Sequence, residues 1–440
     1  MSSEEFQHIR WFRDSAPYIN AHRGRTFVIV FGGEAALHSN FANIIHDIAL
    51  LHSLGVRLLL IHGARPQIAR RMSAAGFEGR FHDGVRITDT TELAYVKDAC
   101  GSLRTDIEAL LSTGLPNSPM QGASITVTGG NFITAQPLGV VDGVDFQHTG
   151  RVRRVDDRAI RQQLDAGCIV LLSPLGYSPT GEIFNLSLED ISVRTAAAVG
   201  AEKLLLFGAG RGIQDGDELV RQCNLTQALD LLRGALEPEQ RRLLQTARQA
   251  CTAGVKRCQI VSYAEDGALL QELFTHDGSG TLVGPDEYEQ ARTASIEDVG
   301  GILELIEPLE REGVLVKRSR EVLETEIDRF RVLERDGRII ACAALYPFTE
   351  HGSGELACIV THPDYRGGDR GARLLRELEQ AAARQGLSQV FVLTTRTAHW
   401  FLEQGFEEST LAALPQERQS LYNLQRSSKV FSKKLSIKPL

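Results

Sequence analysis

Patterns typical of buried strands alternate with helical patterns along the first part of the chain, and this alternation restricts the fold more than any other feature. Short apolar runs recur, each beside a stretch with helical periodicity, at 25–33, 56–63, 168–176, 202–210 and 257–263. Repeated strand–helix units build a parallel sheet between two layers of helices. The sequence therefore predicts an α/β fold, a three-layer α/β/α domain with a mainly parallel sheet.

The alternation ends in segment 276–299, which is rich in glycine, proline and charge. Because 440 residues exceed one typical core, we expect a first domain over 1–285, a linker over 286–294 and a second domain over 295–440. Beyond the linker, the pattern predicts helices at 298–311 and 320–330, strands within 331–348 and at 354–362 and 390–395, and a short helix within 398–406. This order indicates a compact α+β domain.

Charge and cysteine spacing argue against several classes of protein. The net charge of −8 disfavours a nucleic-acid binder, whose surface is usually basic. No apolar run is long enough to span a bilayer, and the first residues lack the apolar core of a signal peptide. The seven cysteines have no paired spacing, which favours reduced thiols over disulfides or zinc. We expect a cytoplasmic protein with no metal site and no membrane partner.

A glycine-rich turn within 360–375, VTHPDYRGGDRGARLL, joins a predicted strand to a predicted helix. Its glycines allow backbone N–H groups to approach a phosphate, the helix start adds partial positive charge, and Arg366 and Arg370 add full charges. Asp369 interrupts the glycines, and we interpret it as a capping residue that accepts a backbone hydrogen bond. From spacing alone, a phosphate site and a plain helix start are equally supported.

The order strand, HPDYRGG, helix, strand, WFLEQGF resembles the GNAT superfamily of acyl-CoA N-acetyltransferases, although the loop has Arg366, Asp369 and Gly371 where the superfamily has Arg/Gln, Gly and Gly. The segments ERDGRIIACAALYPF, GELACIVTHPDYR and LYNLQRSSKVF resemble the classical bacterial N-acetylglutamate synthases over nearly the whole chain. In that family an amino acid kinase-like domain precedes the GNAT domain. The resemblance implies acetyl transfer from acetyl-CoA to the α-amine of L-glutamate, the first step of arginine biosynthesis, with feedback inhibition by L-arginine and a homo-oligomer, a hexamer by analogy.

The resemblance also implies roles for individual residues of the GNAT domain. Glu355 is implied as the general base and Thr394 as the hydroxyl near the sulfur, with the backbone N–H of Ile359 or Val360 polarising the thioester carbonyl. Coenzyme-binding residues are implied at Ile359, Val360, Arg366, Gly367, Gly368 and Gly371. Glutamate-binding residues are implied at Arg318, Cys358, Arg426 and Ser428, because two carboxylates need fixed cations.

The first domain resembles the amino acid kinases but lacks their phosphoryl-transfer residues. Val30 stands where the kinases have a lysine, Ala64 and Arg65 replace glycines of the phosphate loop, and Leu243 aligns with a second lysine. Phosphoryl transfer depends on such charges, so we expect no kinase activity and no use of ATP. The resemblance instead implies an L-arginine site, whose positions are Tyr18, Lys203, Glu272, Gly278 and Gly280. Gln259 departs from the histidine often found in the family.

Three other functions remain open from the sequence. A bifunctional acetylglutamate synthase/kinase would turn over ATP. A sensor without catalysis would bind arginine and coenzyme A but release no thiol. A protein N-acetyltransferase is less favoured, because the basic residues suit a small dicarboxylate better than a peptide.

Overall fold

The computed structural model describes residues 9, 11–114, 118–275, 277–284, 289–335, 338–366, 369–420 and 428–435. The chain forms two compact units, Met1–Asp286 and Glu287–Leu440. Three residues predicted from the sequence lie outside the described residues: Gly367 and Gly368 of the coenzyme loop and the substrate residue Arg426.

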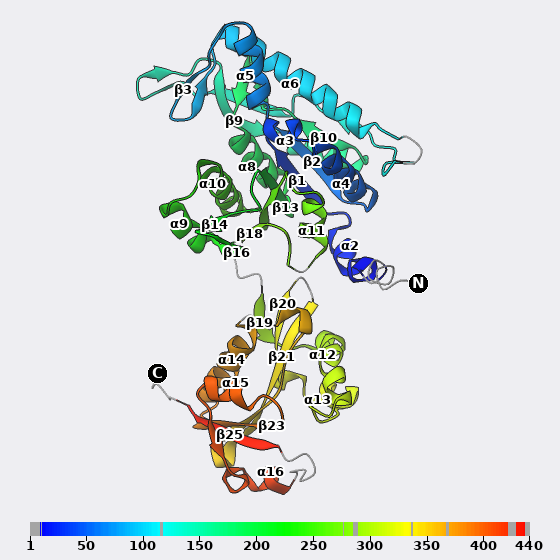
Figure 1. The fold of residues 1–440 in the computed structure, drawn as a ribbon, viewed down its shortest axis with the longest axis vertical. Helices are drawn as coiled ribbons and strands as arrows, with labels where there is room; N and C mark the ends of the chain where they lie inside the picture. Colours follow the sequence, from blue (N-terminus) through cyan, green and yellow to red (C-terminus); the bar gives the residue numbers. More distant parts are fainter. Residues whose placement is uncertain are drawn as a thin grey trace. The chain divides into compact units, whose positions relative to one another are not determined.

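The first unit is built on a mainly parallel sheet, as the alternating pattern predicts (Figure 1), and this sheet has eight strands, three more than the apolar runs indicated. The strand order is β16-β18-β17-β13-β1-β2-β10-β5, and β18 is antiparallel to β17. The central strands read as nearly unbroken apolar runs because both of their faces are covered. Their bounds are β1 Thr26–Phe31, β2 Arg57–His62, β5 Val127–Thr128, β10 Ile169–Leu172, β13 Lys203–Gly208, β16 Gln222–Asn224, β17 Arg257–Ser262 and β18 Thr281–Gly284.

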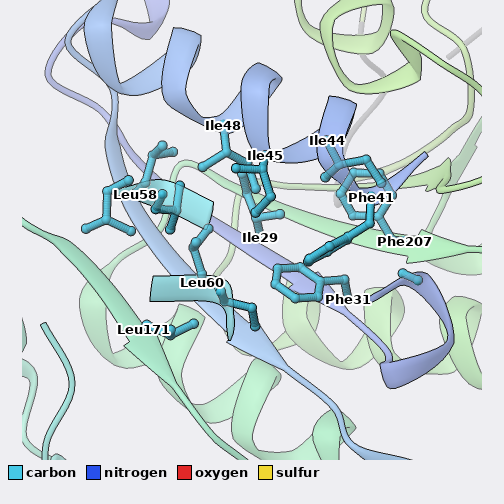
Figure 2. Close-up of a cluster of buried hydrophobic side chains, with 14 of the residues drawn as sticks. Ile29, Phe31, Phe41, Ile44, Ile45, Ile48, Leu58, Leu60, Leu171 and Phe207 are labelled. Atoms are coloured by element: carbon cyan, nitrogen blue, oxygen red, sulfur yellow. The ribbon is translucent and has the colours of Figure 1, made fainter. Parts of the chain in front are cut away.

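Helices cover both faces of this sheet and bury a separate apolar core on each. Phe41, Ile44, Ile45 and Ile48 of one helix project onto Ile29, Phe31, Leu58 and Leu60 of the strands (Figure 2). That face is covered by α4 Phe41–Ser53, α5 Arg65–Ala74, α6 Thr90–Leu111 and α11 Ala268–Phe274. The opposite face is covered by α7 Asp157–Asp165, α8 Leu188–Val199, α9 Leu225–Arg233 and α10 Pro238–Thr252. Two further helices, α2 Ala16–His22 and α3 Gly33–Leu37, flank β1 in the chain.

A closed four-stranded barrel and three small hairpins interrupt the alternation, and the sequence analysis did not predict them. The barrel order is β11-β12-β9-β6, and its residues are β6 Ile133–Pro137, β9 Thr149–Val155, β11 Leu175–Tyr177 and β12 Ile183–Leu186. The hairpins are β3 Arg80–His82 with β4 Val85–Ile87, β7 Val140–Val141 with β8 Val144–Asp145, and β14 Gln214–Asp215 with β15 Glu218–Leu219. These strands are too short to show a clear period of two.

The second unit is an α+β domain with one seven-stranded sheet, in the order β19-β20-β21-β22-β23-β25-β24. Helices α12 and α14 lie on opposite faces of β21 (Figure 1). The strands are β19 Gln290–Thr293, β20 Phe330–Arg335, β21 Arg338–Phe348, β22 Ser353–Thr361, β23 Gln389–Thr394, β24 Glu407–Ser409 and β25 Lys429–Lys434. The helices are α12 Val299–Arg311, α13 Arg320–Thr325, α14 Arg370–Arg384, α15 Ala398–Glu403 and α16 Gln416–Ser420.

Segment 286–294, which we expected to be a linker, contains a strand of the second sheet. Strand β19 pairs antiparallel with β20 from Gln290–Glu334 to Thr293–Arg331. Strand β19 lacks an apolar pattern in the sequence, because an edge strand is paired on one side only and tolerates polar residues. The expected helix at 320–330 is also shorter, since α13 ends at Thr325 and a 3₁₀ turn follows at Ile327–Arg329.

Candidate functional site

Strand β22 carries a bulge in the middle of the second unit. Ala344 of β21 pairs with Ala357 and Cys342 pairs with Val360, so two residues of β22, Cys358 and Ile359, lie opposite one residue of β21. Cys358 has a φ of 51°, in the left-handed region that a side chain other than glycine rarely adopts. A bulge of this kind interrupts the ladder and redirects backbone groups, and bulges are frequent beside active sites.

The pairing between β22 and β23 ends directly beside this bulge. Their parallel ladder runs from Ser353–Gln389 to Leu356–Val392. From Ala357 to Thr361, β22 has no strand partner on that side within the described chain, so its backbone polar groups there can accept a ligand. Ile359 and Val360, the sequence-predicted coenzyme residues, lie on this segment.

Thr394 is the last residue of β23 and supports the turn that follows. Its hydroxyl oxygen accepts the backbone N–H of Thr397 at 3.1 Å and lies 2.9 Å from the Thr397 hydroxyl. Its neighbour in register on β25 is Lys429, which places Ser428 at the same end of the sheet. This geometry suits a positioning role for Thr394 better than proton donation.

Arg318, Cys358 and Tyr346 form a partly buried cluster next to the bulge. The Arg318 guanidinium carbon lies 6.0 Å from the Tyr346 ring centroid. Burial opposes the charge of Arg318, but Cys358, Tyr346 and Glu355 outweigh that effect and raise its pKa. Burial raises the pKa of the Cys358 thiol to about 11, although Arg318 acts in the opposite sense. At neutral pH the Arg318 guanidinium is therefore charged and the neighbouring Cys358 thiol is neutral.

Glu355 is buried and makes a bidentate ion pair with Arg418 of α16. The Arg418 Nε–H donates to Oε2 at 2.5 Å and Nη2–H donates to Oε1 at 2.9 Å. Glu355 faces Tyr346 across the β21–β22 ladder. The sequence-predicted base thus lies in the cluster that contains Arg318, and Arg418 engages both of its carboxylate oxygens.

The predicted coenzyme helix, α14, begins at Arg370, but two of the expected roles around it differ. Asp369 occupies the capping position without capping a backbone N–H, and its carboxylate instead pairs with Arg376, seven residues or about two helical turns further on. Arg370, whose charge we assigned to the coenzyme, donates to the carboxylate of Glu289. Arg366 remains exposed, and its Nε lies 3.4 Å from the Thr361 carbonyl.

Gly371 has a packing reason to lack a side chain. A Cβ there would lie 3.2 Å from the Trp400 ring, closer than most real contacts. Trp400 belongs to α15 and packs against the apolar core on that face of the sheet. The indole therefore fits closely over the first turn of α14.

Sequence reasoning missed several side chains of this site. Tyr346 donates its hydroxyl to Glu326 Oε2 at 2.8 Å, and the Arg329 guanidinium lies 5.1 Å from the same ring. Arg418 reaches Glu355 from 63 residues further along the chain. Such contacts leave no spacing signal, because they form only when β21, β22 and the surrounding helices pack together.

In the first unit, apolar side chains occupy two positions, 30 and 243, at which the family resemblance predicts lysines. Val30 is buried within β1. A Cβ at Gly208 would lie 2.6 Å from Leu243 Cδ1, so this hydrocarbon side chain covers the carboxyl end of β13. The Glu239 carboxylate accepts the backbone N–H of Ala209 at 3.2 Å at the same place. A leucine and a carboxylate there disfavour a bound polyphosphate.

Several predicted arginine-site residues gather around the buried carboxylate of Glu272. Glu272 Oε2 accepts the backbone N–H of Ser279 at 2.7 Å and of Gly280 at 2.9 Å, and Oε1 accepts Gln259 Nε2–H at 3.0 Å. A Cβ at Gly278 would lie 2.5 Å from Glu272 Oε2, and one at Gly280 would lie 2.0 Å from the Ile260 carbonyl. The glycines are therefore required by this backbone cage.

Gln259 and Lys203 extend this arrangement along the same face of the sheet. Gln259 Oε1 is buried and accepts no hydrogen bond from the described residues, which is unusual for a native amide. The buried Lys203 lies with its Nζ 5.8 Å from the Phe27 ring centroid. Tyr18 of α2 packs against the core on that face.

One group of potential metal ligands appears that we did not expect from the sequence. Among the described residues, His82, Asp83 and Asp142 place one ligand atom each within 4.8 Å of one another. His82 Nε2 lies 3.9 Å from each carboxylate, and both aspartates are largely exposed, as in ordinary surface ion pairs. Within the described chain, every helix is too short or too polar to cross a membrane.

Comparison with known proteins gives matches over both units. Residues 25–262 match the amino acid kinase family, and residues 326–408 match the acetyltransferase (GNAT) domain. The amino-acid acetyltransferase of Azotobacter vinelandii is 58% identical over 429 residues, which are 97% of this chain and 99% of the relative.

Two solved structures match the chain along the same length. The N-acetylglutamate synthase from Neisseria gonorrhoeae complexed with coenzyme A and L-arginine has a TM-score of 0.89 at 38% identity, covering 97% of this chain and 99% of that one. The structure of that enzyme complexed with coenzyme A and N-acetyl-glutamate has a TM-score of 0.63 with the same identity and coverage.

Proposed function

Since the chain belongs to the amino-acid acetyltransferases, with an amino acid kinase domain and a GNAT domain, we propose that it acetylates the α-amine of L-glutamate and is inhibited by L-arginine. Acetyl-CoA is its co-substrate, as in the GNAT domain it contains. The observation that carries the substrate proposal is the Arg318 guanidinium, held beside the β22 bulge at Cys358. A cation at that position can hold a carboxylate of the amino acid close to the thioester.

The bulge supports direct transfer of the acetyl group. The amine nitrogen forms a bond to the acetyl carbon, the carbon–sulfur bond breaks, and the sulfur takes up a proton. Backbone N–H groups at Ile359 or Val360 are our candidates for stabilising the oxyanion. Glu355 is our candidate to receive the amine proton. The neutral, buried Cys358 thiol argues against an acetylated cysteine intermediate.

We assign the two carboxylates of glutamate to the basic side chains around this bulge. Arg318 is placed by its contact with Tyr346, and Ser428 lies beside the end of β23. Arg426, two residues before Ser428, completes the proposed set by resemblance. Arginine suits this role because its planar guanidinium binds a carboxylate through two hydrogen bonds.

The proposed inhibitor site uses the buried acceptors of the first unit. Glu272 lies beside Gln259, whose Oε1 accepts no hydrogen bond within the described part of the chain, so two acceptors are available for a guanidinium. Lys203 offers a cation for the amino-acid carboxylate, and Tyr18, Gly278 and Gly280 surround the position by resemblance. The N-acetylglutamate synthase of Neisseria gonorrhoeae was solved with L-arginine, which supports L-arginine as the ligand we propose.

We further propose that the first unit has no kinase activity and that the chain assembles as a homo-oligomer. Leu243 and Glu239 at the end of β13, together with Val30 in β1, support the first statement. The second rests on the family resemblance. Static light scattering after gel filtration would give the number of subunits.

Release of free thiol from acetyl-CoA, measured without ATP across the amino acids, tests the proposed function. We expect thiol release with L-glutamate and suppression by L-arginine. Release with glutamate but no response to arginine would remove the inhibitor site and retain the enzyme. Absence of release with every amino acid, together with intact binding of coenzyme A and arginine, would favour a sensor.

A further inference from the structure

The first residue of the coenzyme helix is held by a carboxylate from the very start of the second unit. Arg370 Nε–H donates to Glu289 Oε1 at 2.8 Å and Oε2 at 2.9 Å, and Nη2–H donates to Oε1 at 2.6 Å. Its Nη1–H donates to the Tyr365 carbonyl at 3.0 Å. The guanidinium thus ties Glu289 to the turn that leads into α14.

Arg335 at the end of β20 completes this group, which we call the Glu289 clamp: Glu289, Arg335, Tyr365 and Arg370. Arg335 Nη1 lies 3.7 Å from Glu289 Oε1. The two guanidinium carbons lie 5.8 and 5.7 Å from the buried ring of Tyr365. The Glu289 side chain is 13% exposed, so this ion pair is largely protected from solvent.

Glu289 lies at the first described position of the second unit, far from α14 in the sequence. The two units divide at Asp286 and Glu287, and Glu289 directly precedes β19. The carboxylate therefore joins the segment that connects the units to the N-terminus of α14. Backbone N–H groups at a helix N-terminus bind phosphate more tightly when their positions are fixed in advance.

We infer that Glu289 is a positioning residue for the coenzyme, acting through Arg370 and Tyr365 on the first turn of α14. This inference rests on the proposed function in assigning that turn to acyl-CoA. Without the Glu289 carboxylate, the guanidinium groups of Arg335 and Arg370 lose the counter-ion that they share in a poorly solvated place. Because two like charges then repel each other there, the first turn of α14 shifts. The alternative is that Glu289 competes with the coenzyme for Arg370, in which case its removal would strengthen binding.

The test compares Glu289→Gln with Glu334→Gln by titration calorimetry of coenzyme A. Glu334 is a matched control, because it also pairs with an arginine across β19 and β20, Arg292 at 2.6 Å, and this partner belongs to β19 and not to α14. We expect Glu289→Gln to raise the Kd of coenzyme A about 10-fold and Glu334→Gln to change it less than about 2-fold. Equal effects, or tighter binding by Glu289→Gln, would overturn the inference.

A second variant and a kinetic measurement separate positioning from loss of folding. Arg335→Gln removes one cation but leaves the Glu289–Arg370 bonds, so we expect a smaller rise in Kd than for Glu289→Gln. In thiol release, Glu289→Gln should raise the KM for acetyl-CoA while the KM for L-glutamate and kcat stay close to wild type. A general fall in kcat would contradict the inference. Because the calorimetry needs no amino acid, it tests the clamp even if the wild-type protein fails to acetylate glutamate.

Discussion

Exchange of Glu355 for glutamine, compared with exchange of Arg418 for glutamine, separates the structural and catalytic contributions of their ion pair. Both variants break the same bidentate contact, in which the side chains are 11% and 20% exposed. If Glu355 is the general base, only Glu355→Gln removes it. The two variants should therefore lose similar stability but differ in catalysis.

The expected magnitudes follow from the burial of the pair. Removal of one partner of a fully buried ion pair costs about 3–5 kcal/mol. Partial exposure reduces this to about 2 kcal/mol. For a unit of this size that corresponds to a fall in Tm of about 4–8 °C. Loss of a general base lowers kcat about 10²- to 10⁴-fold, whereas loss of Arg418 should lower it less than about 10-fold.

Thiol release at saturating acetyl-CoA and L-glutamate gives kcat, and differential scanning calorimetry gives the Tm of each variant. The double variant Glu355→Gln/Arg418→Gln should be less destabilised than the sum of the single variants, because the pair is already broken in each. If Arg418→Gln lowers kcat as much as Glu355→Gln, Glu355 acts through the ion pair and not as the base. Normal kcat in Glu355→Gln would refute its catalytic role outright.

Three further predictions concern the inhibitor site, the buried thiol of Cys358 and Asp47, a half-buried acid on α4. Glu272→Gln should raise the half-inhibitory concentration of L-arginine, measured by thiol release, about 30-fold. This factor corresponds to the loss of a charge-assisted hydrogen bond of about 2 kcal/mol. An unchanged half-inhibitory concentration would show that arginine binds elsewhere. Cys358→Ser should keep kcat within about 10-fold of the wild-type value, because a thiol with a pKa of about 11 is a poor nucleophile at neutral pH. Mass spectrometry should find no acetyl group on the wild-type enzyme after incubation with acetyl-CoA. An acetylated Cys358 would contradict this prediction. Burial, aided by Asp266, raises the pKa of Asp47 to about 7, so the folded state binds the proton more tightly than the unfolded chain and stability falls as pH rises from about 4 to about 7. Asp47→Asn should therefore raise Tm by a few degrees at pH 8 and by less at pH 5, and equal shifts at the two values would show that Asp47 is not responsible.

Local interpretation of the coenzyme loop from the sequence was only partly successful. The helix start and the order of elements around it were predictable, because they depend on neighbouring residues. The capping role predicted for Asp369 was wrong, because its carboxylate pairs with Arg376 seven residues later. The pairing of Arg370 with Glu289, 81 residues earlier, was not predicted. A charge read in a linear sequence gives no indication of which opposite charge folding will bring to it.

The sequence by itself determined the two fold classes and the absence of kinase lysines at positions such as Val30, because hydrophobic periodicity and residue identity are local properties. It also identified Arg318, Cys358 and Glu355 by resemblance, and the structure brings these residues to one cluster. Only the tertiary structure decided the bulge at Cys358, the Arg418 pair and the Glu289 clamp. Each of these depends on strand register or on side chains that meet across elements, and such contacts arise from the packing of the whole unit rather than from any short segment.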